Sequence, residues 1–392
     1  MVKADAYGHG AVPIARALQE AGADGLCVAA LDEAIALREG GIGLPILVLY
    51  PIPPALAEVA RRHEIGVTAG DVQLLAALLA ALPAAPGARD RPEVGPHYPL
   101  AVHLEVETGL GRGGFAGSEL PAAATSIVAN GSVRLASLWT HLQAPEDEAR
   151  TASQLGRFEQ AAADLEAAGV PLPVRHLAAS AGLLLDGVAS LDGARPGLSI
   201  YGLVPDELLP PDDPGGSYAP GLPAIRLPRS AAARLRPILT LKARPVRVTD
   251  VPANWGIGYG PTFTTSRPSR IATLPLGYGD GWPRSLSNRA EALVRGSRVP
   301  LVGNVAMDAI MADVTDVAGA PVSVDDEFVL IGRQGDGHIS AADLAAARGT
   351  NSWEVVTSLA ARLPRVYHAA SLPRETRTLV SDEVGGRRSM RP

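Results

Sequence analysis

The sequence predicts an α/β protein in which a (β/α)8, TIM-type barrel is followed by a mainly β C-terminal domain. Three observations support this fold class. Short apolar runs alternate with segments of helical period through the first half of the chain, polar residues follow those runs directly, and short β-type runs take over after Leu235. Continuous apolar strands that alternate with amphipathic helices are typical of a parallel sheet covered by helices.

Eight apolar runs in the first half are the expected barrel strands, at residues 2–3, 26–29, 46–50, 65–68, 100–106, 135–139, 174–178 and 194–200. Between them we expect helices over residues 11–21, 32–39, 54–63, 71–82, 119–128 and 146–168. Eight repeats of this unit favour a barrel. A doubly wound open sheet is the alternative, although it usually carries fewer strands.

Polar residues that follow these runs favour the barrel over the open sheet. The catalytic groups of a barrel enzyme lie at the C-terminal ends of its strands. The residues in that position are Lys3, Tyr7, Arg112, His141, Ser180 and Arg195. The sequence therefore predicts one site on the C-terminal rim of the barrel.

We place the barrel domain at residues 1–232 and the mainly β domain at residues 233–392, with a Pro- and Gly-rich loop or linker at 207–229. A second Pro-rich stretch, 82–99, is expected to be a loop inserted in the barrel, and the polar residues 382–392 are expected to fray. The strand-like runs of the second domain are residues 239–241, 245–248, 271–276, 292–294 and 328–331.

Composition argues against several classes of partner. The net charge is −6, the pI is about 5.8 and aromatic residues make up 4% of the chain, which disfavours nucleic acid and acidic membranes. The most apolar window, residues 74–82, is far shorter than the about 20 residues that span a bilayer. Cys27 is the single cysteine, so no intrachain disulfide can form. We expect a soluble, cytoplasmic protein with a small-molecule substrate and no metal.

The segment Val2-Lys3-Ala4-Asp5-Ala6-Tyr7-Gly8-His9-Gly10 is the strongest chemical signal. A lysine at the end of a barrel strand can form an imine with an aldehyde cofactor. A lone lysine in that position is more often a solvated surface group, so the interpretation of Lys3 depends on the motifs that accompany it.

This segment and a series of later motifs resemble the alanine racemases, which use pyridoxal 5'-phosphate (PLP). The later motifs are Glu107-Thr108-Gly109-Leu110-Gly111-Arg112-Gly113, Trp139-Thr140-His141, Ala179-Ser180-Ala181, Ala194-Arg195-Pro196-Gly197-Leu198, Gly258-Tyr259-Gly260, Leu276-Gly277-Tyr278-Gly279-Asp280-Gly281 and Gly303-Asn304-Val305-Ala306-Met307-Asp308. Each motif alone is weak. The whole series in the right order is specific.

The resemblance implies that Lys3 holds the cofactor and that Arg112 contacts its phenolic oxygen and the substrate. It places Arg195 at the pyridine nitrogen, where a permanent positive charge keeps that nitrogen unprotonated and limits side reactions such as transamination. The resemblance also places His141 among the residues that bind the cofactor. The phosphate would be bound by hydroxyl and backbone N–H groups of Tyr7, Ser180, Gly197 and Leu198.

A racemase needs two bases, because one proton leaves one face of Cα and another arrives at the opposite face. The resemblance assigns these bases to Lys3 and to Tyr259 from the partner subunit of a homodimer. A tyrosine with a free pKa of about 10 needs a cationic or hydrogen-bonding neighbour, which would be His141 together with Arg195. The substrate carboxylate would be bound across the dimer by Met307 and Asp308.

The sequence departs from the family pattern at four places. Glu105 stands where family members commonly carry a carbamylated lysine, and we expect it to supply the negative charge to Arg112 directly. Trp353 stands where a phosphate-binding tyrosine is usual, and Ala179 replaces a polar residue. Lys3 has only two residues before it where the family has about 35, and a strand usually needs about 5–6. We expect a truncated first strand, from a mis-assigned start codon rather than a damaged copy.

Taken together, the residues and the resemblance predict a PLP-dependent alanine racemase that interconverts L- and D-alanine and supplies D-alanine for peptidoglycan. The alternatives are a racemase of broad amino-acid specificity, a PLP-binding protein without catalysis and an inactive truncated copy.

Overall fold

The computed structural model describes residues 1–82, 98–185, 188, 191–209, 234–369 and 372–378, which form two compact units. Unit 1 comprises Met1–Ile200 with Ala219–Leu235, and unit 2 comprises Tyr201–Tyr218 with Arg236–Pro392. The domain boundary expected at residues 232–233 falls within 210–233, outside the described residues. The same holds for the frayed tail and for most of the two Pro-rich loops.

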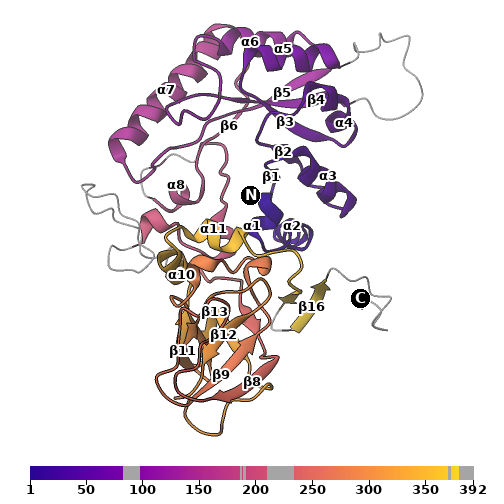
Figure 1. Ribbon diagram of the computed structural model, residues 1–392. Coiled ribbons are helices and arrows are strands. Elements are labelled where there is room, and N and C mark those ends of the chain that lie inside the picture. Colours follow the sequence, from indigo (N-terminus) through magenta and orange to yellow (C-terminus); the bar gives the residue numbers. More distant parts are fainter. Residues whose placement is uncertain (83–97, 186–187, 189–190, 210–233, 370–371, 379–392) are drawn as a thin grey trace. The chain divides into compact units, whose positions relative to one another are not determined.

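Unit 1 is built on a curled parallel sheet whose six strands follow one another in chain order (Figure 1). Six of the eight apolar runs form these strands, and each run was predicted as a strand from its continuous apolar sequence. The strands are β1 (Leu26–Val28), β2 (Ile46–Val48), β3 (Ile65–Ala69), β4 (Leu100–Glu105), β5 (Val133–Trp139) and β6 (Val174–His176).

Helices connect these strands, as the crossovers of a parallel sheet require, and they lie close to the predicted ranges. Asp71 and Asp147 cap two of them, because their carboxylates accept hydrogen bonds from Leu74 N and Arg150 N at 2.8 and 2.9 Å. No helix in the described ranges has the length and apolar character needed to cross a membrane. The helical elements are α1 (Lys3–Tyr7), α2 (Ala11–Glu20), α3 (Leu31–Glu39), η1 (Pro54–Leu56), α4 (Ala57–Arg62), α5 (Val72–Ala81), α6 (Leu120–Val128), α7 (Glu148–Ala167), α8 (Ser180–Leu184) and η2 (Leu198–Tyr201). The next element, η3 (Asp206–Leu208), belongs to unit 2.

The first and eighth expected strands form no regular strand. Val2 N donates to Cys27 O at 2.9 Å. Near the eighth, Gly193 forms one parallel bridge with His176, and Arg195 N donates to Ala178 O at 2.8 Å. The terminal amine of Met1 donates to Pro196 O at 3.0 Å and so joins the two ends of the sheet. Residues 194–200 cannot extend a ladder, because Pro196 has no N–H and the chain enters η2 at Leu198.

Residues alternate in character along the inner strands, which gives the sheet an apolar and a polar face. Val102, Leu104 and Leu138 are fully buried. The residues between them, such as His103 and Ser137, are polar and point to the opposite face, since successive side chains of a strand alternate. The helices cover one face of the sheet (Figure 1). The polar face is therefore available for a site.

Unit 2 is mainly β, as predicted, and contains an eight-stranded sheet with the order β14-β13-β10-β11-β12-β9-β8, in which β7 also pairs with β13. All of its pairings are antiparallel. Strands β15 and β16 form a separate pair. The elements are β7 (Leu241–Ala243), β8 (Arg247–Val251), β9 (Ser269–Leu274), η4 (Tyr278–Asp280), η5 (Arg284–Leu286), β10 (Glu291–Val294), β11 (Ser297–Val302), β12 (Ile310–Asp313), β13 (Phe328–Gln334), β14 (Gly337–Ile339), α10 (Ala341–Arg348), α11 (Ser352–Thr357), β15 (Arg365–Ala369) and β16 (Leu372–Arg377).

Two glycines of unit 2 have the same backbone conformation but differ in how closely other atoms pack against them. Gly281 has φ +92°, and a Cβ added there would lie 2.0 Å from Ser358 O. Gly319 has nearly the same φ, +93°, but open space around it.

We expect Gly281→Ala to lower the free energy of unfolding of unit 2 by about 3 kcal/mol or more, because it adds a backbone clash to the strained φ. Gly319→Ala is the matched control and should cost only about 1 kcal/mol. Urea unfolding followed by circular dichroism measures both, and equal losses would show that the contact at Ser358 is not tight.

Candidate active site

Lys3 opens a left-handed turn, which is rare for residues other than glycine. Ala4, Asp5, Ala6 and Tyr7 all have φ between 52° and 54°. Such a conformation costs roughly 1–2 kcal/mol per residue, so the surrounding structure must hold it in place. The turn puts Lys3 and Tyr7 at its two ends.

Hydrogen bonds from outside the turn hold this strained backbone. Glu33, in the first turn of α3, accepts a bond from Ala4 N and bonds from Ala29 N and Ala30 N at 2.8 and 3.0 Å. Asp5 accepts a bond from Ala11 N at 2.8 Å and so ties the turn to α2. The two carboxylates therefore anchor the turn to α3 and to α2.

The setting of Lys3 favours its neutral amine. Burial lowers the pKa of Lys3, and the positive charge of Arg112 lowers it further, while Glu33 acts in the opposite direction. A lysine must lose its proton before it can attack an aldehyde, so a lowered pKa makes it a better nucleophile.

Tyr7, Ser180 and Gly197 come together from three separate segments. Ser180 Oγ accepts hydrogen bonds from Gly197 N at 2.8 Å and Ser199 N at 3.2 Å, and it is not the N-cap of its own helix α8, which is Ala179. A Cβ on Gly197 would lie 2.5 Å from the Tyr7 hydroxyl oxygen, so only glycine leaves room for that hydroxyl. Leu198 follows as the first residue of η2. Burial raises the pKa of Tyr7 to about 12, so its hydroxyl stays protonated and can donate.

Arg195 is a buried cation, with 6% of its surface exposed. Its Nη2 donates to Thr140 O at 2.7 Å, and its Nη1 donates to His176 O at 2.9 Å and contacts His176 Nδ1. The guanidinium carbon lies 4.9 Å from the ring centroid of Trp139, a cation–π contact. Burial lowers the pKa of Arg195 to about 10, which leaves the group charged at neutral pH.

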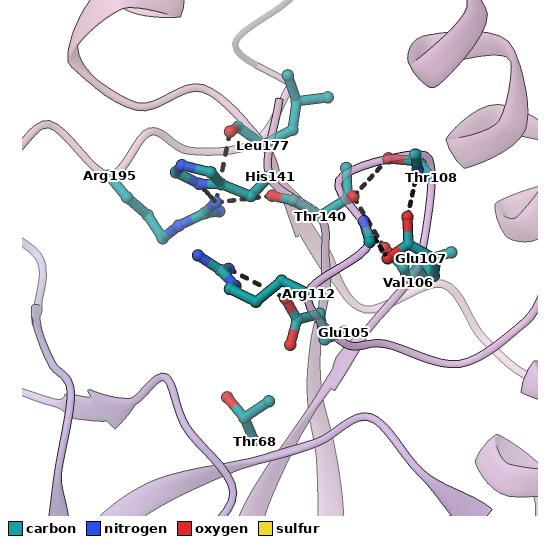
Figure 2. Close-up of polar contacts among 12 residues, drawn as sticks. Thr68, Glu105, Val106, Glu107, Thr108, Arg112, Thr140, His141, Leu177 and Arg195 are labelled. Atoms are coloured by element: carbon teal, nitrogen blue, oxygen red, sulfur yellow. Dashed lines mark hydrogen bonds and ion pairs between the residues drawn. The ribbon is translucent and has the colours of Figure 1, made fainter. Parts of the chain in front are cut away.

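Arg112 and Glu105 form an ion pair with a distance of 3.1 Å between Nη2 and Oε1 (Figure 2). Glu105 has 7% of its surface exposed. Burial raises the pKa of Glu105, whereas the hydrogen bond and charge of Arg112 lower it. The guanidinium of Arg112 also lies 5.8 Å from the ring centroid of Tyr50.

His141 is held in its neutral form. Burial, followed by the charges of Arg195, Arg112 and Lys3, lowers its pKa to about 3. Arg195 Nη2 lies 3.5 Å from His141 Nδ1 (Figure 2). A guanidinium can only donate, so Nδ1 accepts and the proton of the neutral ring is on Nε2.

Gln154, a fully buried residue of α7, ties together the loops that carry Arg112 and His141. Its Nε2 donates to Thr108 Oγ1 and to His141 O, both at 3.1 Å. The hydroxyls of Thr108 and Thr140 bond to each other at 2.7 Å.

Tyr259 belongs to unit 2, where 78% of its surface is exposed. Gly258 and Gly260 on either side have φ of +78° and +51°. The side-chain amide of Asn304 donates to Tyr259 O at 2.8 Å and to Gly260 O at 3.0 Å, so it fixes the turn that presents the phenol.

The other predicted residues of unit 2 are on two separate elements. Met307 is half exposed, and Asp308 beside it forms an ion pair with Arg362 at 2.6 Å. Arg362 also pairs with the buried Asp280, at 2.7 Å. Trp353 is the second residue of α11, a short helix whose N-cap is Asn351.

Several residues of this site were not predicted from the sequence, because no motif marks them. Their one signal is a polar residue inside an otherwise apolar strand run, or a helix residue that lies next to the site only in three dimensions. They are Glu33, His103, Ser137, Gln154 and His176. In the ranges that the structure describes, no group of three or more His, Cys, Asp or Glu residues is arranged to hold a metal ion.

The comparisons with known proteins identify the family of this chain. Family models described as "Alanine racemase, N-terminal domain" and "Alanine racemase, C-terminal domain" match residues 1–205 and 238–367. An alanine racemase of Symbiobacterium thermophilum is 41% identical over 94% of this chain and 89% of that protein, and one of Sorangium cellulosum is 39% identical over 94% and 90%.

Solved structures give the same result. The crystal structure of alanine racemase from Bacillus anthracis with bound L-Ala-P matches 96% of this chain and 89% of that chain, with a TM-score of 0.80 and 31% identity. The alanine racemase of Streptomyces coelicolor A3(2) matches 93% and 90%, with a TM-score of 0.77 and 34% identity. The chain therefore belongs to the alanine racemase family.

Proposed function

We propose that this protein interconverts L- and D-alanine with PLP as its cofactor, acts in the cytoplasm and supplies D-alanine for peptidoglycan. The observation that carries the proposal is the convergence of three features in unit 1. They are the Lys3 amine with its lowered pKa, the hydroxyl and amide groups around Gly197, and the buried guanidinium of Arg195. D-alanine formation from L-alanine, with and without added PLP, tests it.

The residues of unit 1 fit the chemical groups of PLP. Lys3 suits the aldehyde, and Tyr7, Ser180, Gly197 and Leu198 suit the phosphate, since the space beside Gly197 would be filled by a Cβ. Arg195 suits the pyridine nitrogen and Arg112 the phenolic oxygen, with His141 beside them. Trp353 could add an indole N–H to the phosphate from its own unit. When bound, PLP supplies an electron-withdrawing ring that acidifies the Cα–H bond of an amino acid.

Protons move through two residues in this proposal. Lys3 Nζ would lie on one side of Cα and the hydroxyl of Tyr259 of the partner subunit on the other. Whichever of the two is deprotonated takes the Cα proton on its side, and the other, which carries a proton, delivers it on the opposite side; the two exchange these states when the reaction runs in the other direction. Neutral His141 offers Nε2–H as a hydrogen-bond donor rather than a positive charge. The charge that favours the tyrosinate comes from Arg195 behind it.

A homodimer in which unit 2 completes the partner's site accounts for the exposure of Tyr259 and Met307. An aromatic and a methionine exposed on turns fixed by glycine and asparagine are typical of contact surfaces. Met307 N–H and Asp308 would then bind the substrate carboxylate across the dimer, with Arg362 holding the Asp308 side chain.

We expect Lys3→Ala and Tyr259→Phe each to be inactive as single variants. The absorbance band of the lysine-bound cofactor, at about 420 nm, should be missing in Lys3→Ala and present in Tyr259→Phe. Mixed and allowed to exchange subunits, they should recover about one quarter of wild-type activity, because half of the dimers are hybrids and each hybrid has one intact site. Tyr98→Phe, at an exposed tyrosine of unit 1, should behave as wild type. Inactive mixtures would show that the site is not shared between subunits.

Gly197→Ala should weaken PLP binding by about tenfold or more, because its Cβ takes the place of the Tyr7 hydroxyl. Gly193→Ala is the matched control: its Cβ would make only an ordinary contact of 3.9 Å with His176. Titration of the apoprotein with PLP, followed by absorbance, measures both. Equal affinities in the two variants would remove Gly197 from the phosphate site.

Glu105→Gln keeps the shape of the side chain and removes its charge, so Arg112 would lose its ionic partner. We expect kcat/KM for alanine to fall about tenfold or more, since a buried charged hydrogen bond contributes roughly 1.5–3 kcal/mol. Glu119→Gln, at an exposed carboxylate that accepts one backbone bond, is the control. Unchanged PLP affinity and turnover in Glu105→Gln would contradict the role of Glu105.

A further inference from the structure

Behind Arg195, three polar side chains that belong to none of the motifs form a continuous chain across neighbouring strands. His103 of β4 and Ser137 of β5 are register partners, and His103 Nδ1 lies 2.6 Å from Ser137 Oγ. His176 of β6 lies on the other side, with its Nε2 3.0 Å from the same oxygen. His176 Nδ1 contacts Arg195 Nη1, so the chain ends on the guanidinium.

The Arg195 guanidinium fixes the donor-to-acceptor direction of each hydrogen bond in this series. Arginine has only donors, so His176 Nδ1 must accept from Arg195. The proton of the neutral His176 ring is then on Nε2 and is donated to Ser137 Oγ. The single hydroxyl proton of Ser137 is left to be donated to His103 Nδ1. Each group thus fixes the tautomer of the next one.

The surroundings support neutral rings in this chain. Burial, followed by the charges of Arg195 and His103, lowers the pKa of His176 to about 2. Burial and Arg134 lower the pKa of His103 to about 3. A protonated ring could not accept a hydrogen bond from the neighbouring donor, so the burial and the hydrogen bonding are consistent with each other.

Packing holds both rings in place. The ring of His176 stacks on Trp139 with centroids 6.4 Å apart and planes within 8° of parallel. On the other ring, a Cβ at Gly66 of β3 would lie 2.5 Å from His103 Nε2, so this glycine makes room for the imidazole. The same Trp139 ring lies against the Arg195 guanidinium.

We propose that His103 and Ser137 are positioning residues, which act through His176 to hold the Arg195 guanidinium in one orientation and so keep the reaction on racemisation rather than transamination. Without the Ser137 hydroxyl, the imidazole of His176 loses the partner that orients its Nε2–H. Its Nδ1 would then no longer be fixed toward Arg195. The part that concerns the reaction rests on the proposed function.

The first test needs no cofactor. In histidine-15N-labelled apoprotein at neutral pH, we expect His176 and His103 each to show one tautomer, with Nδ1 unprotonated. Ser137→Ala should convert the His176 signals to a mixture of tautomers, and His103→Leu should produce a smaller shift in the same direction. Ser137→Thr, which keeps the hydroxyl, should retain the wild-type pattern, and Ser269→Ala removes a buried strand hydroxyl of unit 2 as a control for nonspecific effects.

The second test uses the holoenzyme. We expect Ser137→Ala and His103→Leu to raise the ratio of transamination to racemisation by about tenfold and threefold, measured as loss of the cofactor absorbance per turnover, with KM for alanine nearly unchanged. Ser137→Thr and Ser269→Ala should keep the wild-type ratio.

Unchanged tautomers in Ser137→Ala would overturn the proposal, whatever the activity. A changed tautomer with an unchanged ratio would overturn the link to reaction specificity. If the wild type does not racemise alanine but shows the expected tautomers, the proposed function fails and the positioning of Arg195 stands.

Discussion

A buried guanidinium that can only donate hydrogen bonds is the constraint around which the site of unit 1 is arranged. Removing the charge of Arg195 from water is costly unless every N–H group finds an acceptor. The carbonyls of Thr140 and His176 and the imidazole of His176 accept hydrogen bonds from the Nη1 and Nη2 groups of Arg195, and the Trp139 ring lies against the planar face. The ends of β5 and β6 therefore meet at one cation. Its charge adds to the effect of burial, which is the main cause of the lowered pKa values of His141 and His176.

The opposite side of the site depends on a strained turn. Four residues with positive φ after Lys3 are unfavourable in isolation, and the carboxylates of Glu33 and Asp5 compensate by accepting the backbone N–H groups. Strain of this kind persists only where the surrounding structure holds it in place. Here it brings the ends of one short segment, Lys3 and Tyr7, to two different parts of the site, one beside Arg112 and one beside Gly197.

The strands and helices of unit 1 could largely be predicted from the sequence. Continuous apolar runs identified all six strands of the parallel sheet, and the 3.6-residue period identified the helices from α2 to α7. These patterns are local, because burial on both faces of a strand leaves a sequence signature that needs no knowledge of its neighbours. The chain forms no regular strand at 2–3, where a truncated strand was predicted, or at 194–200. The reason is that pairing depends on available N–H groups and on backbone φ, which hydropathy does not report.

The amino-acid sequence by itself determined the fold class, the family and the residues that carry recognisable motifs, among them Lys3 and Arg195. Only the tertiary structure decided which unmarked residues support them. His103 and His176 are 34 and 39 residues away in sequence from Ser137, and the three residues lie on three different strands. A polar residue in an apolar run has no partner until the strands are placed in register. The physical reason is that hydrogen bonds act over about 3 Å, so their partners are set by the folded backbone and not by distance along the chain.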